Sequence, residues 1–498
     1  MNDLFSLKNL YSAYYDCRKN KRNTHCALQF ELQSEDELIQ LAHELSTHTY
    51  RPLPSTCFVT ASPKQREVFA ANFKDRIVHH LLIKNLEPKW DRKFIFDSYA
   101  CRKNKGTHAA VKRLQQFMRK ASNNESKTAY YLHLDIRSFF VSINKQILYK
   151  LISEKENHPD IKWLLKIVIF NDPTKKTIKL KQLSLFDNIP KQKSLFGRNN
   201  STGLPIGNYT SQFFANVYLN PLDHFVKHNL KCKYYIRYVD DMVLLGPDHN
   251  TLEQWEKQIV LFLKKELSLT LNPKQRKLAP VKNGCNFLGY VIRPSHLLVR
   301  KRTVNKCKYV LNRYQKELIT NNGQYTIQKY DLEILRTLQA ILSSYLGQFL
   351  HASSRNLMKK IIVRFPFLND YFIFQNNYKV KLKCNLSKCR TLKMQYQSIS
   401  QNYPEHLIFF QIGCFYEFYG DQVKIAQDIF GIQKTRIRKT MGPAIGFPTN
   451  KLKQYIEIAL HKNYKTIVIM QTGRYIGYIQ ERAVMLRCEK KVLYEKTK

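Results

Sequence analysis

The chain has 498 residues and carries 82 Lys and Arg against 38 Asp and Glu, a formal net charge of +44. This excess predicts a polyanionic partner, and an aromatic content of 12% favours nucleic acid, which needs neutralised phosphates and flat faces on which bases stack. The length is enough for two or three domains, and the absence of a long apolar run, signal peptide or lipidation motif argues against a membrane protein.

Eleven cysteines are spread singly along the chain. The one close pair, Cys384 and Cys389, has no second pair that would complete a zinc site. We therefore expect reduced cysteines and a cytoplasmic protein.

The first 50 residues contain amphipathic helical patterns, clearest in DELIQLAHELS (residues 36–46). We interpret them as a helical N-terminal extension that supports the rest and has no chemistry of its own. A further predicted helix contains His79 and His80. Neighbouring residues cannot share a helix face, so we interpret both histidines as ordinary surface or groove residues.

Two clusters of basic residues flank that predicted helix. Lys64 and Arg66 precede it, and Arg102, Lys103 and Lys105 crowd a Gly-containing turn before a second, basic helix. A turn of cationic side chains and free backbone N–H groups suits a triphosphate or a template backbone. The alternative is a solvated run of charges.

Two later segments have the same pattern, an apolar predicted strand that ends in one or two acidic residues. AYYLHLDIRSFFVSI (residues 129–143) carries Asp135 before an aromatic pair, and CKYYIRYVDDMVLLG (residues 232–246) reads as a β-hairpin with Asp240 and Asp241 at its tip. Adjacent acids between apolar flanks suffer repulsion and desolvation, which a divalent cation such as Mg²⁺ relieves. Three such carboxylates supply what two-metal phosphoryl transfer needs. The alternatives are a helix-capping Asp135 and a solvated Asp-Asp turn.

The remaining segments follow in order. Residues 171–200 are rich in Lys, Asn, Ser and Pro and indicate an insertion or loop, and residues 203–223 (GLPIGNYTSQFFANVYLNPLD) read as a Gly/Pro loop running into an amphipathic helix. Beyond the hairpin, Lys274 lies in a predicted turn and residues 287–289 begin a strand. Residues 300–375 are basic and helical in pattern.

In order and spacing these features resemble reverse transcriptases, whose palm carries an acid followed by aromatics, a Gly-containing loop and helix, and a Tyr-x-Asp-Asp hairpin, here Tyr238 to Asp241. The resemblance implies an α+β right-hand polymerase with fingers, a palm built on an antiparallel sheet, and a helical thumb. It implies an RNA-directed DNA polymerase whose partners are template RNA, the RNA–DNA hybrid and dNTPs. Asp135 and Asp240 would bind two Mg²⁺ ions, or Mn²⁺ in their place, with Asp241 contributing.

The same resemblance assigns further contacts. The ring of Phe140 would exclude a 2′-OH and so select deoxynucleotides. Lys274, in an Asn-Pro-Lys turn, would lie beside the triphosphate, where a lysine can protonate the pyrophosphate leaving group. Phe287, Leu288 and Gly289 would form the primer grip. The other nucleotide or template contacts would be Lys64, Arg66, Arg102, Lys103, Ile206, Gly207 and Gln212.

The loop before the second helix carries a finer resemblance. Many reverse transcriptases have Gln-Gly-x-x-x-Ser-Pro there, whereas this chain has Ile206-Gly207 and ends the motif in Ser211-Gln212. With SPKQREVFAANFKDRIVHHLLIKNLEP, FDSYACRKNKGTH and SYLGQFLHA, residues 50–355 resemble the reverse transcriptases of diversity-generating retroelements. These copy a template-repeat RNA into cDNA with frequent errors opposite adenine, are encoded by bacteria or phages, and usually come with a small basic accessory protein.

A physical reason for such errors is available. A glutamine in place of Ile206 could hydrogen-bond the nucleotide and anchor the pairing geometry, and an isoleucine cannot. Two alternatives stay open, a phage-defence or group II intron-type reverse transcriptase, and a non-catalytic nucleic-acid binder with an inactive palm. The intact acids disfavour the second.

A Lys/Asn/Ser-rich linker leads into a C-terminal part whose order of strand, helix, Gly-Phe-Pro turn, helix and strand predicts a small mixed α/β domain. This part resembles domain I of the mismatch-repair ATPase MutS, in which a Phe-x-Glu motif stacks on and hydrogen-bonds a mispaired base. The resemblance places Phe415 and Glu417 in those roles. Cys414 stands where an Asp is usual, and core packing of an aromatic strand is the alternative.

We therefore expect five segments: a helical N-terminal extension (1–50), fingers and palm (51–299), a thumb (300–375), a linker (376–392) and a MutS-like domain that binds DNA or RNA (393–498).

Overall fold

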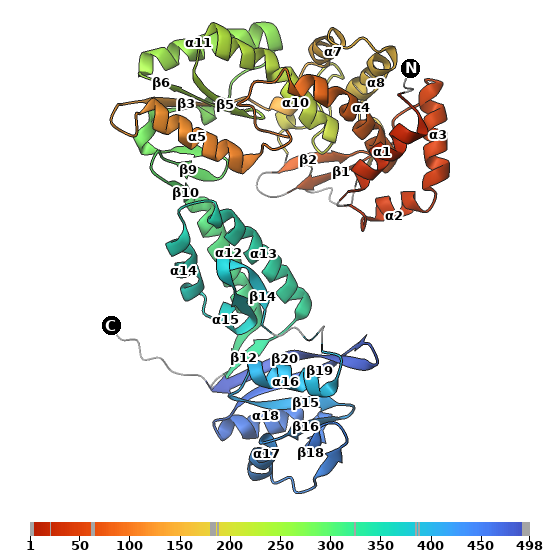
Figure 1. Ribbon diagram of the computed structural model, residues 1–498, viewed down its shortest axis with the longest axis vertical. Helices are drawn as coiled ribbons and strands as arrows, with labels where there is room; N and C mark the ends of the chain where they lie inside the picture. Colours follow the sequence, from red (N-terminus) through yellow and green to blue (C-terminus); the bar gives the residue numbers. More distant parts are fainter. Residues whose placement is uncertain are drawn as a thin grey trace. The chain divides into compact units, whose positions relative to one another are not determined.

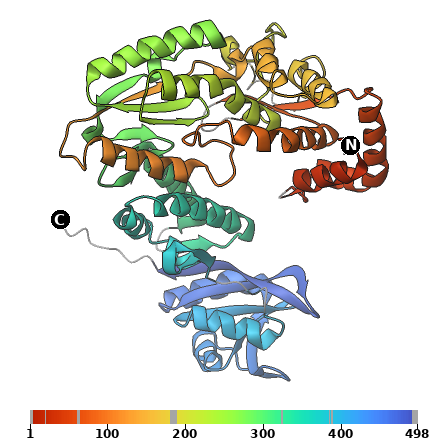
Figure 2. The same cartoon turned by 45° about the horizontal axis from the view of Figure 1, so that its top comes forward.

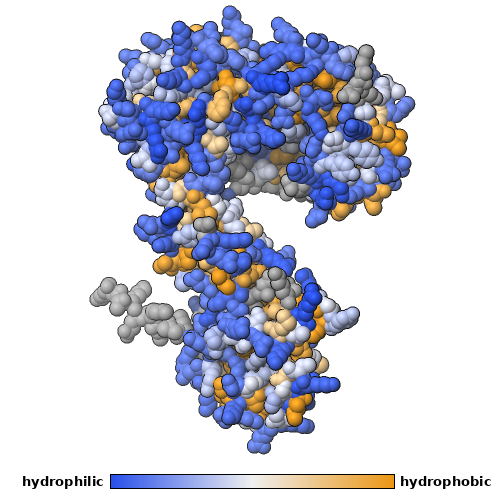
Figure 3. All heavy atoms as spheres, viewed as in Figure 1, coloured by the Kyte–Doolittle hydropathy of each residue, from blue (hydrophilic) through white to orange (hydrophobic). Residues whose placement is uncertain are grey.

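The computed structural model describes residues 4–19, 21–60, 65–179, 186, 189–322, 325–383, 386 and 389–490. The chain forms two compact units, residues 1–296 and 297–498 (Figures 1 and 2). Hydrophilic residues cover most of the visible face of the first unit (Figure 3), as the charge of the chain leads one to expect. Among the described residues, no helix is both long enough and apolar enough to cross a membrane.

Helix α4 (Phe73–Asp91) packs against α1 (Leu7–Arg18) and α2 (His25–Glu31), and α3 (Ser34–Ser46) packs against α1 and α2. Leu38, Leu41 and Leu45 of α3 follow helical spacing, and all three are fully buried in one core with α4. His79 of α4 is only 8% exposed. The interpretation of this histidine as a surface residue is therefore wrong, because α4 is covered on several sides by other helices, whereas the groove interpretation agrees with its place in the lining of two hollows.

The palm is an antiparallel sheet with the order β5-β6-β3-β7. Its strands are β3 (Tyr130–Asp135), β5 (Tyr234–Tyr238), β6 (Asp241–Gly246) and β7 (Lys277–Pro280). After Asp241, β6 is buried at every position, because α11 and α5 cover its two faces (Figure 1).

The other elements of the first unit surround this sheet. The fingers contain a three-stranded sheet of order β2-β1-β4, and β8 pairs with β9 as a hairpin. The bounds are β1 (Ser55–Thr60), β2 (Arg66–Ala70), α5 (Thr107–Ala121), α6 (Phe139–Ser142), α7 (Lys145–Ser153), α8 (Pro159–Phe170), β4 (Thr177–Lys179), α10 (Tyr209–His224), α11 (His249–Leu267), β8 (Cys285–Phe287) and β9 (Tyr290–Ile292).

The second unit begins at β10 (Leu297–Val299) and contains a helical part and a sheet. The helical part comprises α12 (Lys301–Leu318), α13 (Leu332–Leu350), α14 (Arg355–Arg364), α15 (Leu368–Tyr371), β13 (Phe372–Phe374) and β14 (Val380–Leu382). The sheet part comprises β11 (Ile319–Asn322), β12 (Tyr325–Lys329), α16 (Leu392–Asn402), β15 (His406–Ile412), β16 (Phe415–Tyr419), α17 (Gln422–Phe430), β17 (Arg436–Arg438), β18 (Gly442–Pro448), α18 (Leu452–His461), β19 (Lys465–Ile476) and β20 (Ile479–Lys490).

Eight strands form the mixed sheet of the second unit, in the order β11-β12-β20-β19-β15-β16-β18-β17. The hairpin β11–β12 comes from the middle of the predicted thumb, and β12 pairs with β20 over residues 325–329. The expected thumb and MutS-like segments therefore share one sheet. The Gly-Phe-Pro sequence at residues 446–448 is the end of strand β18, so its prediction as a turn is wrong. The predicted α+β class, with an antiparallel palm sheet and a mixed C-terminal sheet domain, is confirmed.

A buried polar cluster also joins these two segments. Arg487 of β20 donates to Asp370 of the thumb helix α15 at 2.6 Å, and Gln328 of β12 donates to the same carboxylate at 2.8 Å. His406 of β15 accepts from the guanidinium of Arg487 at 2.9 Å. Burial, and then the nearby Arg487 charge, lower the pKa of His406 to about 4, so this imidazole is a neutral acceptor at neutral pH.

Candidate active site

Strand pairing brings the three predicted acids to one end of the palm sheet. Asp135 is the last residue of β3 and lies directly opposite Asp241, the first residue of β6. In the β5–β6 hairpin Tyr238 lies opposite Asp241, which leaves Val239 and Asp240 as a two-residue turn. The order of strands in the sheet thus places carboxylates from two separate parts of the chain side by side.

The turn of this hairpin has an unfavourable backbone. Val239 has a φ of 56°, and such strain in a β-branched residue costs about 1–3 kcal/mol. Arg237 stabilises this backbone conformation, because its Nη1 donates a hydrogen bond to the Val239 carbonyl oxygen at 2.9 Å. The Arg237 side chain is fully buried, pairs with Asp223 of α10 at 2.6 Å, and donates to Asn216 and Ser98, each at 3.2 Å. The turn that carries Asp240 is therefore held by a buried arginine that also contacts the neighbouring helix α10 and Ser98.

The electrostatics of the site centre on Asp240. Burial, and then repulsion by Asp135 and Asp241, raise the pKa of Asp240 from 3.8 to about 7, and Arg66 lowers it only in part. Asp135 is held in place by Asn272, whose Nδ2 donates to Oδ2 of Asp135 at 3.0 Å and whose backbone N–H donates to the Asp135 carbonyl at 2.8 Å. The neighbouring carboxylates of Asp135 and Asp241 thus disfavour the charged form of Asp240.

These acids fit a hard divalent cation. Among the described residues, no three His, Cys, Asp or Glu side chains are arranged to hold a metal ion by themselves. Mg²⁺ does not need such a cage, since it is usually held by one or two carboxylates and takes its other ligands from water and substrate phosphates. Asp135 and Asp240 can supply those carboxylates, and the raised pKa of Asp240 reflects a charge that a cation would stabilise.

His133 connects the third acid to the predicted primer grip. Its Nε2 is hydrogen-bonded to Oδ1 of Asp241, and its ring meets that of Phe287 edge-on, with centroids 6.2 Å apart and 82° between the planes. Phe287 is fully buried, whereas Leu288 and Gly289 form the turn of the β8–β9 hairpin with φ values of 47° and 91°. Two positive φ values are the pattern of the tight type I′ turn. The predicted grip is therefore a rigid hairpin that packs beside the acids.

The loop before α10 is tied to the chain on both sides. The Leu204 N–H donates to the Phe140 carbonyl at 2.8 Å, and the Phe69 N–H of β2 donates to the Ile206 carbonyl at 2.8 Å. Gly207 has a φ of 119°, and a Cβ there would approach the Phe69 carbonyl oxygen to 2.9 Å, so only glycine fits. Backbone contacts therefore position Ile206, and its half-buried side chain is not needed to hold the loop.

The predicted basic contacts of the Gly-containing turn differ in availability. The side chain of Arg102 is 8% exposed, pairs with Asp91 at 2.6 Å, and donates to three backbone carbonyls. It supports the turn from inside. Lys103 is exposed and makes no ion pair among the described residues. The structure thus favours Lys103 over Arg102 as the group that can reach a phosphate.

The other predicted nucleotide contacts lie on different elements. Arg66 is exposed at the start of β2 and acts on the charge of Asp240. Gln212 of α10 accepts a hydrogen bond from the Cys101 thiol at 3.2 Å. Lys274 is exposed in the turn after Asn272. Lys64 lies outside the described residues.

The second candidate site is on the C-terminal sheet, where Phe415 and Glu417 of β16 share a face. Phe415 is half-buried, and the guanidinium of Arg436 lies over its ring, 4.6 Å from the centroid. Glu417 is 2% exposed, and its carboxylate is paired with Arg438 and accepts a hydrogen bond from Tyr419. In this conformation Glu417 is not free to hydrogen-bond a base, whereas one face of Phe415 is covered by a cation.

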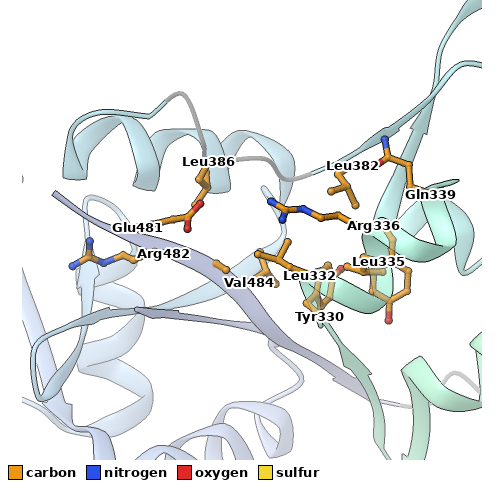
Figure 4. Close-up of a pocket in the computed structure, with 12 residues that line it drawn as sticks. Tyr330, Leu332, Leu335, Arg336, Gln339, Leu382, Leu386, Glu481, Arg482 and Val484 are labelled. Carbon is orange, nitrogen blue, oxygen red and sulfur yellow. The ribbon is translucent and has the colours of Figure 1, made fainter. Parts of the chain in front are cut away.

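A separate pocket of about 160 Å³ lies in the second unit between α13, β14 and β20 (Figure 4). Arg336 of α13 extends towards Glu481, while Arg482, the next residue of β20, points away (Figure 4). Leucine and tyrosine side chains form much of the rest of the lining.

Three residues at the site were not predicted from the sequence: Arg237, Asn272 and His133. The apolar neighbours of Arg237 were a usable signal, because a charged residue in the middle of a buried strand needs a partner. Asn272 is part of the Asn-Pro-Lys turn, but only the bridge between β3 and that turn shows that it faces Asp135. His133 lies two residues before Asp135 and so shares its face of the strand.

Models of two known protein families match separate parts of the chain. The family model for "Reverse transcriptase (RNA-dependent DNA polymerase)" matches residues 61–292, which include all three acids. The chain contains a reverse transcriptase domain. This match indicates an RNA-directed DNA polymerase. A second family model, MutS domain I, matches residues 390–485, the part with Phe415 and Glu417.

Individual relatives match either the reverse transcriptase part or the MutS domain I part of this chain. Protein YkfC of Escherichia coli (strain K12) is 25% identical over 318 residues, or 57% of this chain and 75% of YkfC. The DNA mismatch repair protein MutS of Halothermothrix orenii is 35% identical over 89 residues, or 17% of this chain and only 10% of that protein. A structure of apo telomerase from Candida tropicalis matches with a TM-score of 0.37 and 10% identity, over 52% of this chain and 59% of that one.

Proposed function

We propose that this chain is a reverse transcriptase of the diversity-generating type, which copies a template-repeat RNA into cDNA with errors opposite adenine. The observation that carries the polymerase part is the convergence of Asp135, Asp240 and Asp241 at one end of the palm sheet. We further propose that it works in the cytoplasm of a bacterium, encoded there or by a phage, together with a small basic accessory protein.

The residues of the chain have distinct roles in this proposal. Asp135 and Asp240 accept the cations, which when bound would activate the attacking hydroxyl and stabilise the leaving pyrophosphate. Arg237 holds the hairpin turn that carries Asp240, and Asn272 fixes the carboxylate of Asp135. Lys274 is exposed beside Asn272, where it could donate a proton to the departing pyrophosphate.

The polymerase proposal is tested by primer extension with dTTP and Mg²⁺ on an RNA template. Asp240→Asn should abolish extension and leave RNA affinity within a few-fold, because phosphate contacts come from the basic surface and not from the acids. Extension by the Asn variant at the wild-type rate would contradict the metal assignment. No extension by the wild type would favour a non-catalytic nucleic-acid binder.

The error-prone part of the proposal depends on Ile206. Its backbone is fixed by the hydrogen bond to Phe69 and by the tight fit of Gly207, so exchanging the side chain should leave the loop in place. An isoleucine offers bulk but no donor or acceptor, so correct and incorrect pairs are distinguished mainly by shape. One hydrogen bond is worth about 0.5–1.5 kcal/mol, or up to roughly tenfold in discrimination.

We therefore expect Ile206→Gln to lower misincorporation opposite template adenine severalfold, with smaller changes at other bases. Ile206→Val is the matched control, since it keeps an apolar β-branched side chain and should leave the error spectrum unchanged. Sequencing of cDNA made from one RNA by each enzyme gives the comparison. Equal spectra for the wild type and Ile206→Gln would remove the physical basis for adenine mutagenesis and favour a phage-defence or intron-type enzyme.

For the MutS-like domain we propose contact with the DNA or RNA duplex through Phe415. The pairing of Glu417 with Arg438 means that its predicted hydrogen bond to a base requires this ion pair to open. Phe415→Ala should weaken duplex binding more than Glu417→Gln, measured by fluorescence anisotropy with labelled hybrid. The opposite order would indicate that Glu417 contacts the base directly.

A further inference from the structure

The N-terminal extension, which lies before both family matches, carries an open cationic hollow. The turn between α1 and α2 surrounds a volume of about 740 Å³. Its lining holds four cations beside one aromatic and two small polar side chains: Arg18, Lys19, Lys21, Arg22, Tyr15, Asn23 and Thr24. Among the described residues, neither Asp nor Glu lines it.

Most of this positive charge is not neutralised by an ion pair among the residues that the structure describes. Arg18 is paired with Glu31. Lys19, Lys21 and Arg22 are exposed, and no ion pair engages them in the part of the chain that the structure describes. Like charges gathered in this way raise the local affinity for a polyanion.

A second hollow lies beside the predicted nucleotide loop and has Lys21 in common with the first. It has a volume of about 240 Å³. Its other lining includes Gly207 of the loop, Tyr209 at the start of α10, and Arg76 and His80 of α4, again without an acid among the described residues. The His80 and Tyr209 rings stack with centroids 4.8 Å apart and 21° between their planes. The two hollows, which share Lys21, thus form a path that is cationic at the N-terminal extension and largely apolar or neutral beside the polymerase loop, where Phe58, Val68 and Ala70 also line it.

We propose that this path binds the single-stranded template RNA that has not yet entered the polymerase site. The proposal rests on the polymerase function, because the path begins at the loop predicted to position the nucleotide. Single strands are bound by cations along the backbone together with aromatic faces for the bases. Tyr15, 57% exposed, provides such a face among the cations, and the stacked pair of His80 and Tyr209, the latter 37% exposed, adds aromatic surface in the second hollow. An acidic peptide would bind the cations but would have no bases to stack on the aromatic side chains.

The test uses the full chain and a primer–template duplex with a 5′ template overhang of either 1 or 12 nucleotides. The variant is Lys21→Glu/Arg22→Glu. The matched control, Lys257→Glu/Lys264→Glu, makes the same change in charge at exposed lysines of α11 that form no ion pair among the described residues. Affinities are measured by fluorescence anisotropy without dNTPs over a series of salt concentrations, so they do not depend on catalysis.

We expect the variant to bind the 12-nucleotide overhang about tenfold more weakly and the 1-nucleotide overhang within about twofold. The salt dependence for the long overhang should fall by about 1.4 in log–log slope, which is about 0.7 for each of two lost phosphate contacts. The control should affect both overhangs equally. A loss that is equal for both overhangs, absent, or matched by the control would overturn the proposal.

Two further outcomes separate the possible explanations. If polyglutamate displaces the long overhang and oligouridylate does not, the path binds an acidic peptide and the proposal is wrong. If the wild type shows no extension activity but the overhang effect is present, the polymerase proposal fails while this binding path stands.

Discussion

Asp240 should lower the stability of the metal-free protein at neutral pH. The pKa of its carboxyl is raised from 3.8 to about 7 in the folded chain, chiefly by burial. Between these values the folded chain keeps a proton that the unfolded chain has released, so this stabilisation is complete below about pH 4 and is lost as the pH rises to about 7. At about 1.36 kcal/mol for each pKa unit, the rise corresponds to at most about 4 kcal/mol.

Asp240→Asn removes that charge and should therefore stabilise the metal-free protein at pH 8, by about 2–4 kcal/mol, and by much less at pH 4.5. Urea unfolding in EDTA, followed by tryptophan fluorescence, measures this, because Trp90, Trp163 and Trp255 all lie in the first unit. Glu125→Gln, at an exposed carboxylate after α5, is the control and should show no such pH dependence.

The same reasoning predicts the effect of Mg²⁺. Added Mg²⁺ should stabilise the wild type more than Asp240→Asn at pH 8, since a ligand that binds only the folded state adds stability. An Asn variant that is less stable than the wild type at pH 8, or whose stability difference is the same at both pH values, would refute the account of Asp240 as a buried, uncompensated charge.

Three further outcomes follow from the contacts. Arg237→Met leaves Asp223 without its buried ion-pair partner and should lower the free energy of unfolding of the first unit by about 3–5 kcal/mol. At least half of this loss should be recovered in the double variant Arg237→Met/Asp223→Leu. A free energy of unfolding of the single variant within about 1 kcal/mol of the wild type would contradict the network. Phe140→Val should admit ribonucleotides, because a smaller side chain leaves room for a 2′-OH; an unchanged ratio of kcat/KM for dNTP and rNTP would show that Phe140 does not select the sugar. Deletion of residues 393–498 removes β20 from β12 and should make the thumb sensitive to limited proteolysis; a resistant thumb fragment would show that it folds without the sheet.

Deletion of the C-terminal domain would also affect the thumb. Because β12 and β20 share five paired positions and Arg487 is bonded to Asp370, truncation changes the thumb together with the MutS-like sheet. Point variants such as Phe415→Ala test nucleic-acid contact without that second effect. A changed error spectrum in a truncated enzyme would therefore not by itself assign fidelity to the MutS-like domain.

The sequence by itself determined the features that depend on local pattern. Alternating and continuous apolar runs identified the strand that carries Asp135 and the two strands that flank Asp240, because side-chain periodicity and strand burial are properties of neighbouring residues. The α+β class followed from the same patterns. Gly207 could be recognised as part of a loop, although its necessity depends on the carbonyl of Phe69 lying 2.9 Å from where a Cβ would be.

Only the tertiary structure decided which distant groups meet. Arg237 bonds to Ser98, 139 positions away, and Asn272 to Asp135, 137 positions away, so neither contact has a local sequence signal. Burial of Arg102 and the pairing of Glu417 with Arg438 depend likewise on which elements pack together. Strand β12 of the thumb hairpin pairs with β20 because the edge of β20 has free backbone hydrogen-bonding groups that any strand in register can use. The side-chain periodicity of a strand does not predict which other strand it will pair with.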